Sequence, residues 1–123
     1  MTNERQRFGQ SSEQMAALFL QRNGYRILER NYRTRAGEID IIAKHQGALV
    51  FVEVKARRSG SYGDPKWAIT PAKQRKLSMA ALIYLKANDA MDQRARFDVV
   101  TLQTVEDHPK IEVIRNAFEL AYG

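Results

Sequence analysis

Two stretches in the first half of the chain combine runs of apolar residues with isolated acids. Residues 37–43 read GEIDIIA and residues 49–55 read LVFVEVK. Successive side chains of a strand point to opposite faces, and both stretches fit this period, so we predict two strands. The polar break between them holds Gln46 and Gly47, and a glycine at positive φ favours a tight antiparallel hairpin.

The register of this hairpin brings acidic residues together. If position 45 faces position 48, Asp40 lies opposite Glu53 with the two Cβ atoms roughly 5 Å apart, a separation at which like charges destabilise a sheet. Glu38 falls opposite Lys55 in the same ladder, so a lysine is expected at the edge of the pair. A slip of one residue would move Asp40 to the other face.

The surroundings of these acids are apolar. The flanking valines and isoleucines are typical of strands covered on both faces, where a carboxylate needs a cation or a hydrogen-bonding partner. We therefore predict a metal site with Asp40 and Glu53 as ligands, and oxygen donors of this kind suit Mg²⁺ or Mn²⁺. The alternative is a pair of solvated carboxylates, with Glu38 and Lys55 forming an ordinary cross-strand ion pair.

A helix is expected over about residues 12–23, ending at Gly24, after a flexible N-terminal arm at residues 1–10. Its core-facing side carries Glu13, so this acid is aimed toward the sheet. A structural explanation is available, because any Glu near a helix N-terminus is favoured by the helix dipole.

The rest of the pattern predicts an α/β fold in a single domain of 123 residues. A strand over residues 25–32 precedes the hairpin. A helix opened by Thr70 and Pro71 follows it, and two strands around a turn complete the chain. Their bounds are predicted as residues 70–88, 97–104 and 110–115.

Two polar features within these elements are expected to be structural. His45 and His108 fall in turns and are expected to be exposed rather than ligands. Asp98 lies in an apolar strand, where Arg96 on the same face can neutralise it. The sequence has no cysteine, so it offers no disulfide, thiol nucleophile or thiolate metal site. It also has neither an apolar run long enough to cross a bilayer nor a signal-peptide pattern, so a cytoplasmic location without membrane contact is expected.

The formal net charge of +6 indicates a polyanionic partner. Basic residues flank the acidic hairpin, which is the distribution that phosphate binding beside a metal requires. The expected partner is nucleic acid, with DNA as the expected kind, and the candidate contacts are Arg35, Arg57, Arg58 and Lys73. The alternative is a solvated basic surface, in which Lys73 only adds solubility.

Several of these motifs resemble a known group of proteins. An inward Glu on the first helix, an Asp on the second strand and Glu-x-Lys on the third resemble the PD-(D/E)XK nuclease superfamily. More narrowly, GEID at 37–40, VFVEVK at 50–55 and RFDVV at 96–100 resemble the YraN-like family of uncharacterised bacterial proteins. Archaeal Holliday junction resolvases are similar in size and motif order. The resemblance implies a restriction-endonuclease-like core of helix, three-strand meander, helix and strand, with helices flanking a central mixed sheet.

The resemblance also implies roles for individual residues. Asp40 and Glu53 would be metal ligands for Mg²⁺ or Mn²⁺, Lys55 would orient or activate the attacking water, and Glu13 would be an auxiliary ligand or hold water. One departure concerns the second helix, where exonuclease-like branches carry Gln-x-x-x-Tyr. Here Gln74 is followed by Ser78 at that spacing, which favours the resolvase-like branch.

Three functions are consistent with the sequence. The first is a metal-dependent nuclease acting on DNA, including branched or damaged DNA. The second is a nucleic-acid-binding module that keeps the fold and the site without useful turnover. The third is a structural or interaction protein whose acids serve folding alone. A homodimer would suit a two-strand substrate, but no stretch of the sequence requires one.

Overall fold

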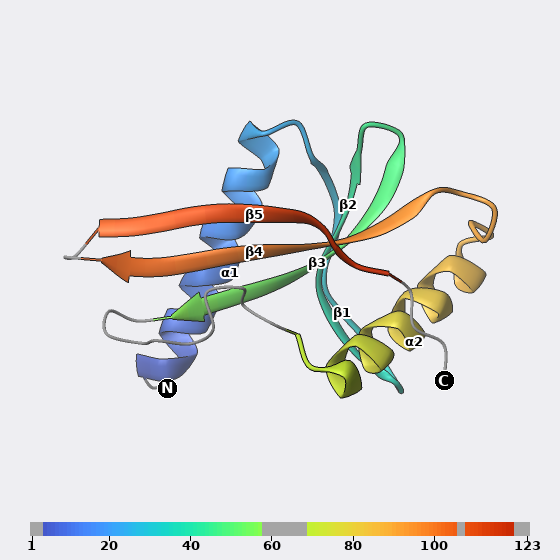
Figure 1. Ribbon diagram of the computed structural model, residues 1–123, viewed down its shortest axis with the longest axis horizontal. Helices are drawn as coiled ribbons and strands as arrows, with labels where there is room; N and C mark the ends of the chain where they lie inside the picture. The colour runs from blue at the N-terminus through green and yellow to red at the C-terminus, as the bar shows by residue number, and fades with distance from the viewer. Residues whose placement is uncertain (1–3, 58–68, 106–107, 120–123) are drawn as a thin grey trace.

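The computed structural model describes residues 4–57, 69–105 and 108–119, which form two helices and five strands (Figure 1). Their bounds are α1 (Glu4–Arg22), β1 (Arg26–Thr34), β2 (Gly37–His45), β3 (Ala48–Arg57), α2 (Pro71–Ala87), β4 (Ala95–Val105) and β5 (His108–Phe118).

The five strands form one mixed sheet in the order β1-β2-β3-β4-β5. Neighbouring strands are antiparallel except β3 and β4, which are parallel. A parallel pair needs a crossover connection, and α2 lies in the connection between these two strands. The order α1, β1-β2-β3 meander, α2 and β4 is the restriction-endonuclease-like core, so the predicted fold class is confirmed. β5 extends the sheet beyond this core.

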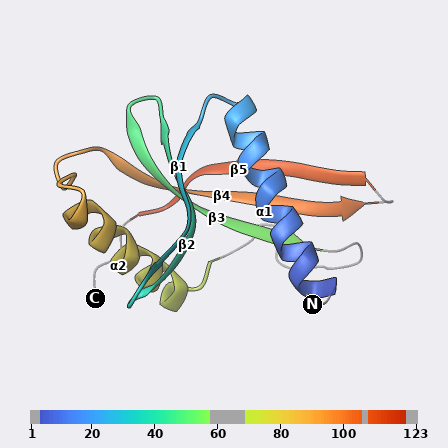
Figure 2. The ribbon, with the colours of Figure 1, turned by 180° about the vertical axis from the view of Figure 1, so that it is seen from behind.

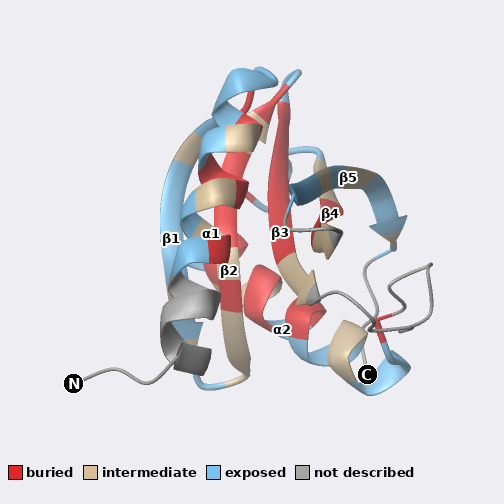
Figure 3. Cartoon of the chain, turned by 90° about the vertical axis from the view of Figure 1, so that its left-hand side faces the viewer, coloured by how far each residue is buried: buried red, intermediate tan, exposed pale blue. Residues whose placement is uncertain are grey.

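The two helices cover opposite faces of the sheet, as the front and back views show (Figures 1 and 2). Alternate residues of β3 divide between them, because Val50 and Val52 pack with Ala16 and Leu20 of α1, whereas Phe51 packs against α2. β2, β3 and β4 are therefore the buried strands, and β1 and β5 remain largely exposed (Figure 3). Any polar group on β2 or β3 lies in or beside the core.

The turn between β2 and β3 has the predicted form. Gln46 and Gly47 both have positive φ, at 50° and 81°, as a two-residue type I′ hairpin requires. His45 consequently pairs with Ala48, and the ladder continues to Ile41 opposite Val52. The hairpin and its register are therefore confirmed over these residues.

The ends of the helices follow from local sequence. The Thr70 side chain accepts a hydrogen bond from the Lys73 backbone N–H at 3.1 Å, and Pro71 occupies the first turn, as predicted. Gly24, at φ 88°, ends α1 by allowing the Tyr25 N–H to reach the Leu20 carbonyl at 3.0 Å.

One predicted boundary was wrong. α1 begins at Glu4, so residues 4–10 belong to the helix, which was predicted to begin only at about residue 12. Apart from Gly9, residues 4–10 are compatible with a helix, and an internal glycine costs only about 1 kcal/mol relative to alanine. Within the described part of the chain, neither helix has the length and apolar character needed to cross a bilayer.

Candidate metal and nucleic-acid site

The core of the candidate site is the carboxylate pair of Asp40 and Glu53. Asp40 lies one residue beyond the last regular β2–β3 pair, and its carboxylate accepts a hydrogen bond from the Val54 backbone N–H of β3 at 2.8 Å. Glu53 is only 7% exposed. The Asp40 side chain therefore spans the gap between the two strands, beside the buried Glu53.

The strict alternation predicted for β2 does not hold across Asp40. Ile39 packs in the cluster on the α2 side, whereas Ile41 packs in the cluster on the α1 side. In a regular strand these two residues would share a face. The irregularity lies where β2 leaves its regular pairing with β3, and the Asp40 carboxylate takes the place of a backbone acceptor there.

The two carboxylates are close enough for Glu53 to affect the pKa of Asp40. Burial, and then the hydrogen bond and negative charge of Glu53, raise the pKa of Asp40 from 3.8 to about 7, although the Val54 N–H and Lys73 act in the opposite direction. Without a bound cation, the pair therefore retains a proton near neutral pH.

A lysine from the second helix reaches this pair. Lys73 lies in the first turn of α2, and its Nζ is 3.4 Å from Oε2 of Glu53. The Lys73 side chain is 44% exposed and that of Glu53 only 8%. Lys73 was predicted from the sequence as a phosphate contact. In the structure Lys73 is also the cation that lies beside the buried Glu53.

Lys55 lies two residues beyond Glu53 on β3. The parallel ladder with β4 runs without interruption from Leu49 to Arg57, so Glu53 and Lys55 point to the same face of the sheet. Lys55 is partly buried, as befits a residue at the margin of the site.

The predicted partner of Lys55 was wrong, because Glu38 instead approaches Arg33 of β1, with Oε2 3.7 Å from Nε. The physical reason is that regular pairing of β2 with β3 ends at Ile41, while its pairing with β1 continues to Gly37.

Glu13 lies near the same acids. Burial, followed by the negative charges of Asp40 and Glu38, raises the pKa of Glu13. Asn31 of β1, with its amide oriented to donate, bridges Glu13 Oε1 at 2.8 Å and Glu38 Oε1 at 3.1 Å. Asn31 has a φ of 54°, a conformation that asparagine tolerates better than most residues. The inward direction predicted for Glu13 therefore brings it to the acidic hairpin.

The other predicted nucleic-acid contacts are less closely placed. Arg35 is exposed in the turn between β1 and β2. Arg57 is the last residue of β3, and Arg58 lies outside the described residues. The structure thus brings Asp40, Glu53 and Lys73 together, and Glu13 lies close enough to Asp40 for the charge of Asp40 to raise its pKa.

The donor set fits a hard divalent cation that completes its shell with water. Among the described residues, no group of three or more His, Cys, Asp or Glu side chains is arranged to enclose a metal. Two carboxylates with mutual repulsion are nevertheless suited to Mg²⁺, which usually keeps several waters and binds through one or two carboxylates.

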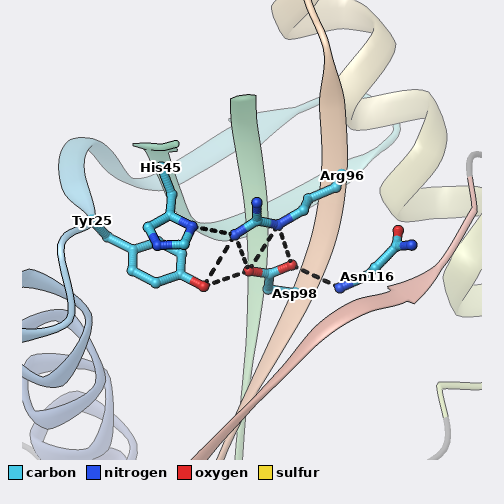
Figure 4. Close-up of polar contacts among 5 residues, drawn as sticks. All are labelled: Tyr25, His45, Arg96, Asp98 and Asn116. Carbon is cyan, nitrogen blue, oxygen red and sulfur yellow. Dashed lines mark hydrogen bonds and ion pairs between the residues drawn. The ribbon is translucent and has the colours of Figure 1, made fainter. Parts of the chain in front are cut away.

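A second buried polar cluster lies at the other end of the β2–β3 hairpin (Figure 4). Asp98 accepts hydrogen bonds from Tyr25 Oη at 2.7 Å, Arg96 Nε at 3.0 Å and the Asn116 backbone N–H at 3.0 Å. His45 stacks on Tyr25 with ring centroids 3.9 Å apart, and its Nδ1 is 2.6 Å from Arg96 Nη2.

This cluster confirms the Arg96–Asp98 pair and corrects the prediction for His45. His45 is only 4% exposed and is part of the core. Its burial, and then the charges of Arg96 and Arg115, lower its pKa, so the ring is neutral at pH 7. The residues around His45 come from Tyr25 just before β1, from β4 and from β5, which are far apart in sequence. A turn position therefore appeared exposed in the sequence. His108 is exposed, as predicted.

The fold and the acid pair define an α/β protein with a restriction-endonuclease-like core and a carboxylate pair on its central hairpin. The chain belongs to the uncharacterised protein family UPF0102, whose model matches residues 12–102. This confirms the resemblance to the YraN-like proteins at the level of the family.

Relatives in this family match nearly the whole chain. A UPF0102 protein of Desulfosudis oleivorans is 55% identical, over 97% of this chain and 95% of its own length. Those of Syntrophus aciditrophicus and Geobacter sulfurreducens are 52% and 51% identical, over 95% and 93% of this chain and 92% and 90% of their own. The family relationship therefore extends through the acidic hairpin, both helices and most of the sheet.

Proposed function

We propose that this protein is a metal-dependent nuclease of the PD-(D/E)XK superfamily that hydrolyses phosphodiester bonds of DNA with Mg²⁺ or Mn²⁺. The observation that carries the proposal is the carboxylate pair of Asp40 and Glu53. Mutual repulsion contributes to raising the pKa of Asp40 to about 7, and a divalent cation would remove that repulsion. A protein that used these acids for folding alone would gain stability by neutralising one of them.

Asp40 and Glu53 would hold the metal. A metal bound there would supply a coordinated water of lowered pKa and a Lewis acid that neutralises charge on the phosphate. Lys55 would orient the attacking water by donating from its Nζ, and Lys73 would donate from its Nζ to a phosphate oxygen. Glu13, whose pKa is raised, would accept a hydrogen bond from the attacking water.

Substrate binding would use the basic residues around this site. Arg35 and Lys73 are at least partly exposed, and Arg57 and Arg58 follow Lys55 along the chain. With the net charge of +6, this distribution favours a phosphate backbone as the partner. Branched and damaged DNAs are the substrates to test first, because the motif order resembles that of junction resolvases.

The test is cleavage of a panel of linear, flapped and four-way DNAs in Mg²⁺ or Mn²⁺. We expect wild type to cut at least one member, Asp40→Asn to be inactive, and Lys55→Met and Lys73→Met to lose about 100- to 1,000-fold. Lys44→Met is the matched control, because Lys44 lies beside the hairpin turn, opposite Leu49, and its Nζ donates a hydrogen bond to Gln93 at 3.0 Å. If wild type and Asp40→Asn bind the panel equally and neither cuts, the catalytic proposal is wrong.

A binding module without turnover is the second candidate. The observation that favours it is the ion pair between Lys73 Nζ and Glu53 Oε2, because this lysine supplies a positive charge beside the pair without a metal. For such a module, Lys73→Met would weaken DNA binding and Mg²⁺ would leave binding unchanged. A nuclease site would instead bind Mg²⁺ through Asp40 and Glu53, and calorimetry separates the two.

A further inference from the structure

An open hollow of about 570 Å³ lies between the end of β1 and the last turns of α2. Its basic lining residues are Arg33, Arg35 and Lys86, and we call it the basic hollow. Tyr32 and Ile83 contribute apolar surface, and no acidic residue lines it. It is separate from the acid pair and from the buried cluster around Asp98.

The charges of the basic hollow are incompletely compensated. Arg33 has Glu38 as a partner, at 3.7 Å between Nε and Oε2, and the Arg33 side chain remains 82% exposed. Neither Arg35 nor Lys86 forms an ion pair with an acid among the residues that the structure describes, and both are exposed. Positive charges that line a concave surface raise the local concentration of anions.

The hollow is connected to the acidic site through Glu38. Arg33 and Glu38 are partners in the β1–β2 ladder, and Asn31 links Glu38 to Glu13. Glu38 and Asp40 lie two residues apart on β2. Arg33, at one end of the hollow, therefore lies next to Glu38, the nearest of these acids. A nucleic-acid backbone that leaves the Asp40–Glu53 pair in this direction would next reach the positive charges of the hollow.

We propose that the basic hollow binds backbone phosphates of a nucleic acid beside the phosphodiester positioned at Asp40 and Glu53. This placement of the strand rests on the proposed function, whereas binding of phosphates in the hollow can be measured without catalysis. Exposed cations from two elements suit a backbone that passes through an open hollow, because such binding gains from counterion release. An enclosed nucleotide site would instead bury most of its ligand.

The test compares two double variants that remove the same charge. Arg35→Gln/Lys86→Gln alters the hollow. Arg26→Gln/Arg94→Gln alters two exposed arginines near the His45 hairpin, where Arg26 pairs with Lys44 and the Arg94 carbonyl accepts from the Leu49 N–H. Binding of a fluorescent DNA duplex is followed by anisotropy between 50 and 200 mM KCl with EDTA present, so that no cleavage occurs.

We expect the hollow variant to lower the slope of log affinity against log salt by about 2, because each phosphate contact contributes about 0.9. The control pair should leave the slope close to that of wild type. Equal loss in both double variants would mean general electrostatics and would overturn the proposal, as would an unchanged slope in the hollow variant.

Two further measurements separate this inference from the nuclease proposal. Inorganic phosphate at constant ionic strength should compete poorly with the duplex, since a single phosphate lacks the extended contact. Competition at low millimolar phosphate would indicate a small-anion site and would contradict a backbone site. If the slope falls as expected while no DNA is cut, the hollow stands and the catalytic proposal fails. If wild type binds no DNA, the hollow proposal fails, whatever calorimetry finds for Mg²⁺ at Asp40.

Discussion

Replacing Asp40 by Asn should stabilise the metal-free protein at pH 8. The pKa of Asp40 is raised in the fold from 3.8 to about 7, so the folded state holds a proton that the unfolded chain has already released. The contribution of Asp40 to stability is therefore greatest below its unfolded pKa and is lost as the pH rises from about 4 through 7. At about 1.4 kcal/mol for each unit of pKa, the full difference is about 4 kcal/mol.

Asn suits this measurement because its Oδ1 can still accept the hydrogen bond from the Val54 N–H, which Asp40 accepts at 2.8 Å. Since Glu53 keeps its charge, we expect Asp40→Asn to raise the free energy of unfolding by about 2–4 kcal/mol at pH 8. Little gain is expected at pH 4. Asp40→Ala should gain less, because the Val54 N–H loses its acceptor.

The assay is urea unfolding in EDTA at pH 4, 5, 6, 7 and 8, with Asp92→Asn as the control at an exposed acid. The stability of wild type and of the control, each compared with that of Asp40→Asn at the same pH, should fall from pH 4 to pH 8. Added Mg²⁺ should stabilise wild type and not Asp40→Asn. If Asp40→Asn were less stable than wild type at pH 8 without metal, the repulsion described for this pair would be wrong.

Three other outcomes follow from the structure. Burial, and then the charge of Arg96, lowers the pKa of His45, so the stability that its neutral ring contributes should be lost as the pH falls below 6.5. Urea unfolding at several pH values should show a smaller loss in His45→Asn than in wild type, and equal acid sensitivity would contradict the burial of a neutral ring. Thr70→Ala should lower the free energy of unfolding by about 1 kcal/mol, and Thr70→Ser much less, because the Thr70 side chain caps α2. Equal losses of stability in the two variants, measured by urea unfolding, would argue against the cap. Lys73→Met should tighten Mn²⁺ binding up to about fivefold in calorimetry, because it removes an ion pair with Glu53 worth up to about 1 kcal/mol. Weaker Mn²⁺ binding in this variant would contradict the idea that Lys73 and the metal compete for Glu53.

The parts of the site predicted from sequence depend on local rules. A two-residue turn at Gln46 and Gly47 sets the register of the hairpin as far as Ile41 opposite Val52, and this register brings Asp40 close to Glu53. Thr70 and Pro71 likewise fix the start of α2 through groups within one turn. Such local signals give the order of helices and strands along the chain, so the fold class could be predicted before the packing of these elements was known.

The parts that the sequence did not supply depend on packing between distant segments. The Lys73–Glu53 ion pair needs the first turn of α2 to lie over β3, and the two residues are 20 positions apart in the sequence. The burial of His45 depends on Tyr25 and Arg96, which come from opposite halves of the chain. Period-two alternation cannot reveal the irregularity at Asp40 either, because it assumes a regular strand.

The most direct test of a metal site at the acid pair is anomalous diffraction from crystals of the wild-type protein soaked in Mn²⁺. We predict one strong anomalous peak between the carboxylates of Asp40 and Glu53, with Lys73 displaced from Glu53, and no such peak in Asp40→Asn. A saturating soak that leaves Lys73 on Glu53 with no peak between the two acids would contradict it.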